Sequence, residues 1–218
     1  MQITPTMREY LGEVYRLEHS RQGVTTGALA ERLDVSSPAV VRMLRKLDQA
    51  GLVRHKPYEG VALTHAGELE ALRSIRRHRL LEAFLVDVMR FGWHEVHDHA
   101  HGLESAINDE FEDRMDELCG HPATCPHGDP IPTKDGHMPA TRDEPLTELQ
   151  TGAGGTLRRV KTDDPDKLRY CAELGLVPGA SLAVVNRAPF NGPIRVRANG
   201  QEHVLGAELA MALRVERD

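Results

Sequence analysis

The sequence predicts a mainly α-helical chain with a small β portion, divided into three parts. Apolar residues recur at helical spacing through most of the first 118 of the 218 residues. Six of the 13 prolines then fall between residues 120 and 145, where regular structure should stop. Short apolar or alternating runs follow between glycine turns, which is typical of a small β-barrel. We therefore expect domains at residues 1–72, 73–140 and 146–218, the second ending in a proline-rich linker.

The first part contains three predicted helices and a hairpin, with the helices at residues 6–19, 27–33 and 39–49. Thr25 or Thr26 can cap the second helix. A serine pair followed by Pro38 supplies a cap and a first-turn proline for the third. Two strand-like pieces around Pro57 and Gly60 predict the hairpin. Together they form a winged helix-turn-helix, which places its third helix in the major groove of double-stranded DNA.

The charge distribution is compatible with DNA binding, although the formal net charge is −6. The charge is +1 over residues 1–75, −9 over 76–150 and +2 over 151–218, so the excess acid lies in the middle. At the start of the third helix, base edges are within reach of Ser36, Ser37, Pro38 and Arg42. Phosphates are better matched by Arg45, Lys46 and Arg54. A protein-interaction module is the alternative for such a domain, but this basic patch argues against it.

The middle part is predicted to be helical and to bind a metal. Helices are expected at residues 66–77, 78–88 and 93–118. His78 and Glu82 share one helical face, as do His97, His101 and Glu104. Imidazole and carboxylate ligands suit Mn²⁺, Fe²⁺, Co²⁺ or Zn²⁺, and an oxygen-rich set favours Mn²⁺. The alternative is that these are solvated polar side chains, an explanation that the density of histidines weakens.

Other patterns are weaker or exclude function classes. Cys119 with His121, and Cys125 with His127, resemble zinc-ligand spacing, but the intervals are irregular and lie among prolines. Three scattered cysteines suit a reducing compartment, and no apolar run reaches the roughly 20 residues of a membrane helix, so we expect a cytoplasmic protein. A metallohydrolase lacks motif support such as HExxH. A DNA-binding regulator with a non-metal effector remains an alternative.

The chain resembles the DtxR/MntR family of metal-dependent transcriptional regulators along essentially its whole length. The resemblance is carried by seven segments: TPTMREYLGEVYRLE, LAERLDVSSPAVVRMLRKLDQAGLV, GVALTHAGELEA, RRHRLLEAFL, EVHDHAHGLE, CPHGDPIP and YCAELGLVPGASLAVV. It implies a repressor rather than an enzyme. It also implies a helical dimerisation domain, an SH3-like (FeoA-like) third domain, and a homodimer on a palindromic operator. Metal would order the N-terminal helix and set the spacing of the two reading heads.

The resemblance also implies two metal sites. His78, Glu82 and His97 match one site, to which the third domain adds Asp164; the other site corresponds to Glu9, His101 and Glu104. An acid at position 9 and a histidine at position 101 favour Mn²⁺ over Fe²⁺ as the sensed metal. Ser105 stands where the family usually has a histidine ligand, and Gly12 where manganese sensors have a carboxylate. The implied function is repression of metal-homeostasis genes in response to Mn²⁺, with Fe²⁺ as the alternative and other divalent transition metals able to bind in vitro.

Overall fold

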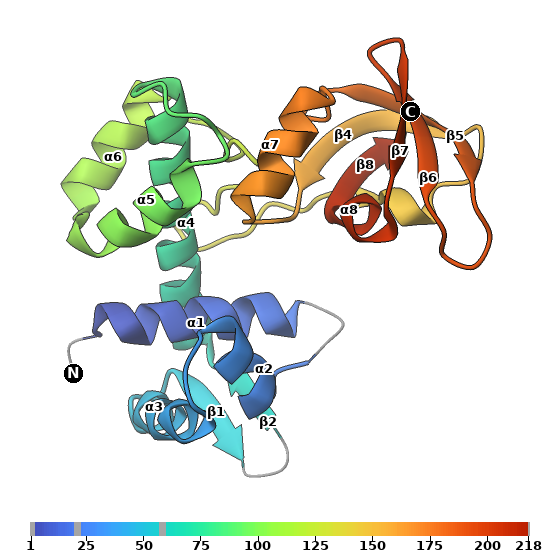
Figure 1. Ribbon diagram of the computed structural model, residues 1–218. Helices are drawn as coiled ribbons and strands as arrows, with labels where there is room; N and C mark the ends of the chain where they lie inside the picture. Colours follow the sequence, from blue (N-terminus) through green and yellow to red (C-terminus); the bar gives the residue numbers. More distant parts are fainter. Residues whose placement is uncertain (1–2, 20–22, 57–59, 218) are drawn as a thin grey trace. The chain divides into compact units, whose positions relative to one another are not determined.

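The computed structural model describes residues 3–19, 23–56 and 60–217 (Figure 1). The chain forms two compact units, one of Met1–His78 with Pro132–Met138 and the other of Arg79–Ile131 with Pro139–Asp218. The architecture is mainly helical with a small C-terminal sheet, which confirms the predicted fold class.

The N-terminal unit contains the predicted three helices and hairpin. They are α1 (Pro5–Glu18), α2 (Thr26–Arg32), α3 (Ser37–Gln49), β1 (Val53–Lys56) and β2 (Gly60–Leu63). Thr25, and not Thr26, caps α2 by accepting the Ala28 N–H at 3.1 Å. Strands β1 and β2 pair antiparallel, with Val53 opposite Leu63. The turn expected at Pro57 lies outside the described residues.

A hydrophobic core joins the helices of this unit. Its fully buried leucines come from all three helices: Leu11 and Leu17 from α1, Leu29 from α2, and Leu44 and Leu47 from α3. This burial orients α3, because the apolar stripe faces the core and the polar stripe remains outside.

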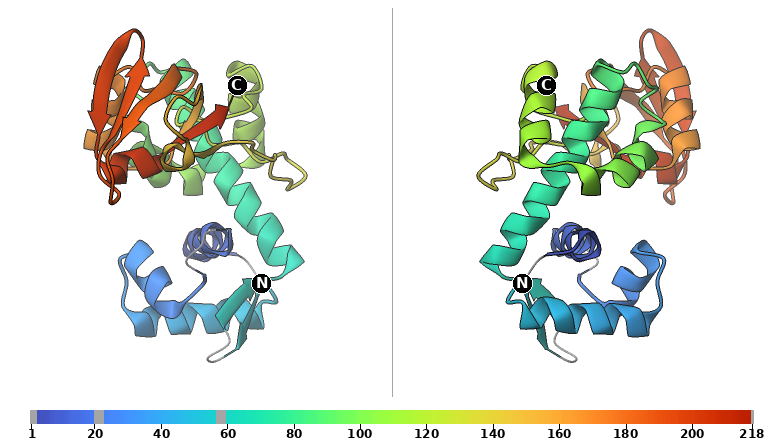
Figure 2. Two further views of the ribbon diagram at one scale, coloured as in Figure 1. Left: turned by 90° about the vertical axis from the view of Figure 1, so that its right-hand side faces the viewer. Right: turned by 90° about the vertical axis from the view of Figure 1, so that its left-hand side faces the viewer.

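Helix α4 (His65–Asp87) corrects the prediction of two helices at residues 66–77 and 78–88. It is one helix of 23 residues, which runs without a break in both views of Figure 2. No proline or glycine occurs between Glu68 and Asp87, so the segment contains no residue that would break it. Leu72 and Ile75 belong to the core of the N-terminal unit, whereas Leu80 belongs to a core of the second.

The single helix predicted at residues 93–118 is also wrong. The structure has α5 (Val96–Leu103), a 3₁₀ turn η1 (Glu104–Ala106) and α6 (Asp109–Leu118). Asn108 is extended, and its side chain accepts the Phe111 N–H at 2.9 Å, which caps a new helix. Val96, Ala100 and Met115 pack with α4 residues in one core.

The C-terminal part of the second unit is a six-stranded antiparallel sheet with strand order β3-β8-β4-β5-β6-β7. The strands are β3 (Glu144–Pro145), β4 (Gly154–Val160), β5 (Ser181–Arg187), β6 (Ile194–Ala198), β7 (Gln201–Leu205) and β8 (Leu213–Arg217). Sequence analysis missed the short helical elements between them, η2 (Leu146–Glu148), α7 (Pro165–Glu173) and α8 (Ala207–Ala212). Leu157, Leu168 and Val196 are among the fully buried residues of this core.

The proline-rich segment has no helix or strand before β3 begins at Glu144, in line with the prediction, and much of its first half is buried. Cys125, His127 and Ile131 are buried, and an isolated bridge joins Thr124 to Pro130. Further along, the Pro132 carbonyl accepts a buried hydrogen bond from Arg76 at 2.9 Å. The segment contributes to two cores, through Met138 in the N-terminal unit and Ile131 in the second, and its first half contains two side chains that could bind a metal ion.

Candidate metal centre and DNA-binding helix

Helix α3 presents the predicted DNA-contacting side chains to solvent. Its buried stripe consists of Val40, Leu44 and Leu47. Every residue singled out for DNA contact is exposed: Ser36, Ser37, Pro38, Arg42, Arg45 and Lys46 on or before α3, and Arg54 on β1. The basic side chains thus lie opposite the apolar stripe and are accessible to a large polyanion.

A buried cluster in the second unit combines three types of metal donor. Glu82 on α4 lies with Cys125 and His127 from the proline-rich segment, and their donor atoms are all within 4.8 Å of one another. His127 Nδ1 is 3.4 Å from a Glu82 oxygen and 3.9 Å from Cys125 Sγ. Each residue is at most 4% exposed. A carboxylate, an imidazole and a thiol buried together form a donor set that fits a transition-metal ion.

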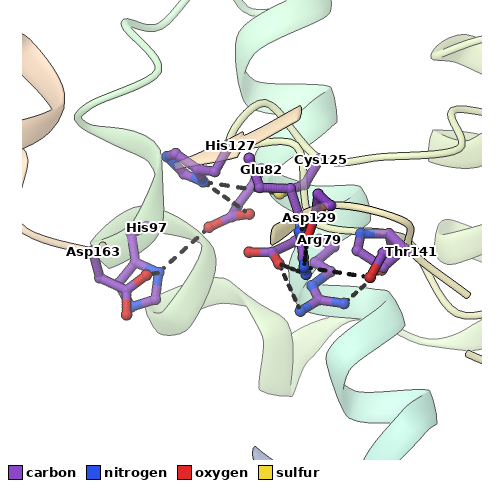
Figure 3. Close-up of polar contacts among 11 residues, drawn as sticks. Arg79, Glu82, His97, Cys125, His127, Asp129, Thr141 and Asp163 are labelled. Atoms are coloured by element: carbon purple, nitrogen blue, oxygen red, sulfur yellow. Dashed lines mark hydrogen bonds and ion pairs between the residues drawn. The ribbon is translucent and has the colours of Figure 1, made fainter. Parts of the chain in front are cut away.

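Glu82 also belongs to a second cluster, with His78 and His97. His78 precedes Glu82 by one turn of α4, and His97 Nδ1 lies 3.4 Å from Glu82 Oε1. His97 is also 3.7 Å from Asp163 Oδ1, on the loop between β4 and α7. Figure 3 shows Glu82 between His97 and His127, with Asp163 beside His97. The structure therefore brings the predicted His78, Glu82 and His97 together.

The orientation of the His127 ring is fixed by a backbone group. Its Nε2 lies 2.8 Å from the Trp93 carbonyl oxygen. A carbonyl can only accept, so Nε2 carries the hydrogen and Nδ1 faces the cluster. Such a contact sets which ring nitrogen is available as a ligand.

The electrostatics of the cluster favour an added cation. Burial raises the pKa of the Cys125 thiol well above its usual value, and the Glu82 and Asp129 carboxylates raise it further. Burial alone would lower the pKa of His127, but Glu82 and the Trp93 carbonyl outweigh it and raise that pKa. Both shifts favour the protonated donors, whereas a bound metal ion would favour their deprotonated forms.

Asp164, which sequence analysis assigned to the first site, lies at the N-cap of α7. Its side chain accepts the N–H groups of Asp166 and Lys167 at 3.0 and 3.2 Å. The carboxylate beside His97 is that of its neighbour Asp163. Resemblance to a family places loop residues less precisely than helical ones, so it did not distinguish Asp163 from its neighbour Asp164.

The three residues predicted for the other site lie on three different elements. Glu9 lies on α1 of the N-terminal unit, His101 is an exposed residue of α5, and Glu104 begins η1. Within residues 3–19, 23–56 and 60–217, the structure brings together two potential metal-binding groups, and these three residues are in neither. This site remains a prediction.

The sequence did not distinguish Cys125 and His127, which the structure places beside Glu82, from a second pair of similar spacing. Their spacing was recognised, but it was grouped with Cys119 and His121, which are in neither cluster. Cys119 is the C-cap of α6, and His121 Nδ1 is 3.0 Å from Asp116 Oδ2. The signal that distinguishes the two pairs is the surrounding HGDPIP sequence, which forms a tight buried turn.

Comparison with known proteins agrees with this layout. Three family models match consecutive parts of the chain: "Iron dependent repressor, N-terminal DNA binding domain" over residues 2–61, "Iron dependent repressor, metal binding and dimerisation domain" over 64–133, and "FeoA domain" over 144–217. The iron-dependent repressor IdeR of Mycobacterium tuberculosis is 32% identical over 231 aligned residues, which cover 99% of each chain. The chain belongs to the DtxR/MntR family of metal-dependent transcriptional repressors.

Two further relatives fall in this family. The diphtheria toxin repressor of Corynebacterium diphtheriae is 28% identical over 98% of each chain. A solved structure described as a manganese-dependent transcriptional repressor in complex with manganese has 38% identity and a TM-score of 0.92, covering 97% of this chain and 100% of its own. DtxR/MntR proteins are DNA-binding repressors and not enzymes, which removes the metallohydrolase alternative. In the described part of the chain, no helix is long and apolar enough to cross a membrane.

Proposed function

We propose that this DtxR-family repressor senses Mn²⁺ and controls metal-homeostasis genes by binding a palindromic operator as a homodimer. The observation that carries the proposal is the buried cluster around Glu82 on α4, a helix that also contributes Leu72 and Ile75 to the DNA-binding unit. A change in the side chains around Glu82 therefore affects α4, the same helix that packs in the core of the DNA-binding unit. We place the protein in the cytoplasm because its operator DNA lies there.

The ligands that we propose for this centre are Glu82, Cys125 and His127, with His97 and Asp163 beside them. A bound divalent cation supplies the positive charge that neutralises the buried carboxylate and lowers the pKa of the thiol. Glu82 provides the charge, His127 offers Nδ1 because Trp93 holds Nε2, and Cys125 releases its proton on binding. His78 completes the second group around the same carboxylate.

We propose Glu9, His101 and Glu104 as the ligands of a second metal site. Support comes from the family resemblance and from the residue types, since a carboxylate pair with an imidazole suits Mn²⁺. Asp164 is less suited to the first site than Asp163, because the Asp164 carboxylate already caps α7 by accepting two backbone N–H groups.

For the DNA complex, we propose that residues 1–72 read DNA, 73–140 bind metal and dimerise, and 146–218 form the SH3-like domain. Base edges are assigned to Ser36, Ser37, Pro38 and Arg42, and phosphates to Arg45, Lys46 and Arg54. Their exposure along one side of α3 supports this assignment. Two-fold symmetry of a homodimer then requires a palindromic operator.

The test is operator binding by fluorescence anisotropy, with and without Mn²⁺, for the natural chain and Glu82→Gln. We expect Mn²⁺ to tighten binding of the natural chain and to leave Glu82→Gln at its metal-free affinity. His121→Ala serves as control because His121 is exposed and in neither cluster. Metal-independent binding by the natural chain would refute the proposal.

Iron sensing is the second candidate, and Cys125 favours it. A thiolate is a softer ligand than carboxylate or imidazole and suits iron better than manganese. Anaerobic titrations of operator binding with Mn²⁺ and Fe²⁺ distinguish the two candidates. Activation by Fe²⁺ at metal concentrations where Mn²⁺ has no effect would establish iron as the sensed metal.

A further inference from the structure

The Cys125–Asp129 turn, which carries two of the proposed ligands, is attached to strand β4 of the C-terminal sheet. Within the turn, the Cys125 N–H donates to the Asp129 carbonyl, and the Gly128 N–H donates to the Cys125 carbonyl, both at 2.9 Å. The Val160 N–H at the end of β4 donates to the His127 carbonyl, also at 2.9 Å. The sheet therefore contacts the backbone of a ligand directly.

Gly128 shows how closely the turn approaches the strand. Its φ is +89°, and a Cβ atom built on it would lie 1.8 Å from the Arg158 carbonyl oxygen. Only glycine combines this backbone conformation with this approach. The turn therefore packs against β4 with no room for a side chain at position 128.

Arg159, the next residue of β4, anchors the other end of the turn through its side chain. Its guanidinium donates two hydrogen bonds of 2.6 Å to Asp143 and one of 3.2 Å to Asp129. The Arg159 side chain is 11% exposed and that of Asp143 only 2%. Arg79 Nη2 lies 3.8 Å from the same Asp129 oxygen and joins the network from α4 (Figure 3). Buried, multiply bonded guanidinium groups of this kind hold their partners in a defined geometry.

We propose that Arg159 is a positioning residue for the metal centre. In the described part of the chain, its side chain hydrogen-bonds to Asp129, Thr141 and Asp143 and to none of the proposed ligands. Its contact with Asp129 holds the Cys125–Asp129 turn in the position that brings Cys125 and His127 close to Glu82. A residue of the sheet thereby determines the ligand geometry of a metal centre whose other residues lie mainly on helices. The inference rests on the proposed metal centre and assigns a role to a residue outside it.

The network contains a matched control, Arg214. It also pairs with Asp143, at 3.0 Å from the carboxylate and 2.8 Å from the carbonyl, and its side chain is partly buried. Among the residues that the structure describes, the hydrogen bonds and ion pairs of the Arg214 side chain go to Asp143, and none reaches the Cys125–Asp129 turn. Arg159→Gln and Arg214→Gln therefore both weaken the Asp143 ion pairs, whereas the first alone removes the charged contact to Asp129.

The experiment measures Mn²⁺ and Co²⁺ affinity by calorimetry in the full-length chain, and thermal stability alongside. We expect Arg159→Gln and Asp129→Asn to weaken metal binding by about ten-fold, the lower end of the range for residues that orient ligands, and Arg214→Gln by less than about two-fold. A second readout is the thiolate-to-cobalt charge-transfer absorption at saturating Co²⁺. It should be weaker per bound ion in Arg159→Gln and unchanged in Arg214→Gln, which a general loss of stability would not produce.

Equal metal affinities for Arg159→Gln and Arg214→Gln would overturn the positioning role, as would an unchanged affinity in Asp129→Asn. If Arg159→Gln does not fold, Asp129→Asn decides the matter alone, because it preserves the size of the side chain. Cys125→Ser distinguishes an error in the proposed metal centre from an error in the positioning role of Arg159. If Cys125→Ser binds metal normally, the proposed centre is wrong; if it loses binding while Arg159→Gln and Asp129→Asn keep theirs, only the positioning role fails.

Discussion

At the scale of single residues, function depends on which polar side chains are buried together. Glu82 is 3% exposed and belongs to both potential metal-binding groups, so it is the common point of the centre. A buried carboxylate requires a partner, since an isolated one costs several kcal/mol. The histidines supply that partner in the metal-free chain, and a cation supplies a stronger one.

Replacing Cys125 tests the assignment of the thiol as a ligand. We expect Cys125→Ser to lose the thiolate-to-cobalt charge-transfer absorption of the Co²⁺-loaded protein. Cys119→Ser should retain it, because Cys119 is in neither cluster. Absorption that survives in Cys125→Ser and disappears in Cys119→Ser would reverse the assignment.

The ion pairs of Asp143 predict a pH dependence of stability. Burial opposes its ionisation, but Arg159 and Arg214 outweigh burial and hold the pKa of Asp143 below its usual value. Its contribution is fully present above the pKa of an unfolded aspartate, about 3.9, and is lost as the pH falls through the lower pKa of the folded state. Asp143→Asn should cost about 3 kcal/mol at neutral pH, the typical effect of breaking a buried ion pair.

Urea unfolding of Asp143→Asn and the natural chain, at neutral pH and near pH 3, measures this difference. The gap in the free energy of unfolding between the two proteins should narrow at the lower pH. A gap that stays constant would show that the aspartate contributes through shape and not through charge.

At the scale of elements, α3 divides its residues between folding and DNA binding. Leu44 is fully buried, whereas its neighbour Arg45 is exposed. Leu44→Ala should lower the free energy of unfolding by about 2–5 kcal/mol. Arg45→Ala should change it by less than about 0.5 kcal/mol.

The assignment of Arg45 to a phosphate also predicts how Arg45→Ala changes DNA binding. Arg45→Ala should weaken operator and non-operator DNA alike and reduce the slope of log affinity against log salt by about 0.9, as expected for one lost phosphate contact. Anisotropy titrations at several salt concentrations measure the slope. An unchanged slope would remove Arg45 from the set of phosphate contacts.

The contact between the metal-binding turn and β4 predicts a difference between two glycines. Gly128 and Gly152 have similar φ values, +89° and +87°, but only Gly128 has backbone within contact range of an added Cβ. Gly152→Ala should lower the free energy of unfolding by about 1–2 kcal/mol, the cost of placing a non-glycine residue in the left-handed conformation. Gly128→Ala should lower the free energy of unfolding further and also weaken metal binding, because the added Cβ forces the turn away from the Arg158 carbonyl. Chemical unfolding and metal calorimetry together check both effects, and equal costs would contradict the close approach.

At the scale of the whole molecule, metal binding and folding are linked. A ligand that binds only the folded state adds about 2.7 kcal/mol to the free energy of unfolding at one hundred times its dissociation constant. We expect saturating Mn²⁺ to raise the unfolding temperature of the natural chain relative to a chelator-treated sample. Calorimetric scans of Glu82→Gln provide the control, and an equal shift in that variant would place the stabilising ion elsewhere.

Local signals in the sequence were sufficient to predict many of the elements. Apolar spacing and caps predicted α1, α2 and α3, and glycine-bounded runs predicted strands β4 to β8 of the sheet but not β3. Local signals also have limits, since periodicity alone did not show that α4 is continuous or that Asn108 starts a new helix. Short helices such as α7 and α8 contain too few turns for a periodic pattern.

Which side chains from separate segments lie together depends on tertiary packing. His78 and Glu82 could be paired from sequence because they lie one turn apart on a single helix. Cys125 and His127 join Glu82 from more than 40 residues away, and the packing of a proline-rich turn against β4 brings them there. The choice between Asp163 and Asp164 likewise depends on which carboxylate caps α7. Helical periodicity constrains residues within one element, whereas ligands from separate segments meet only through the packing of the folded chain.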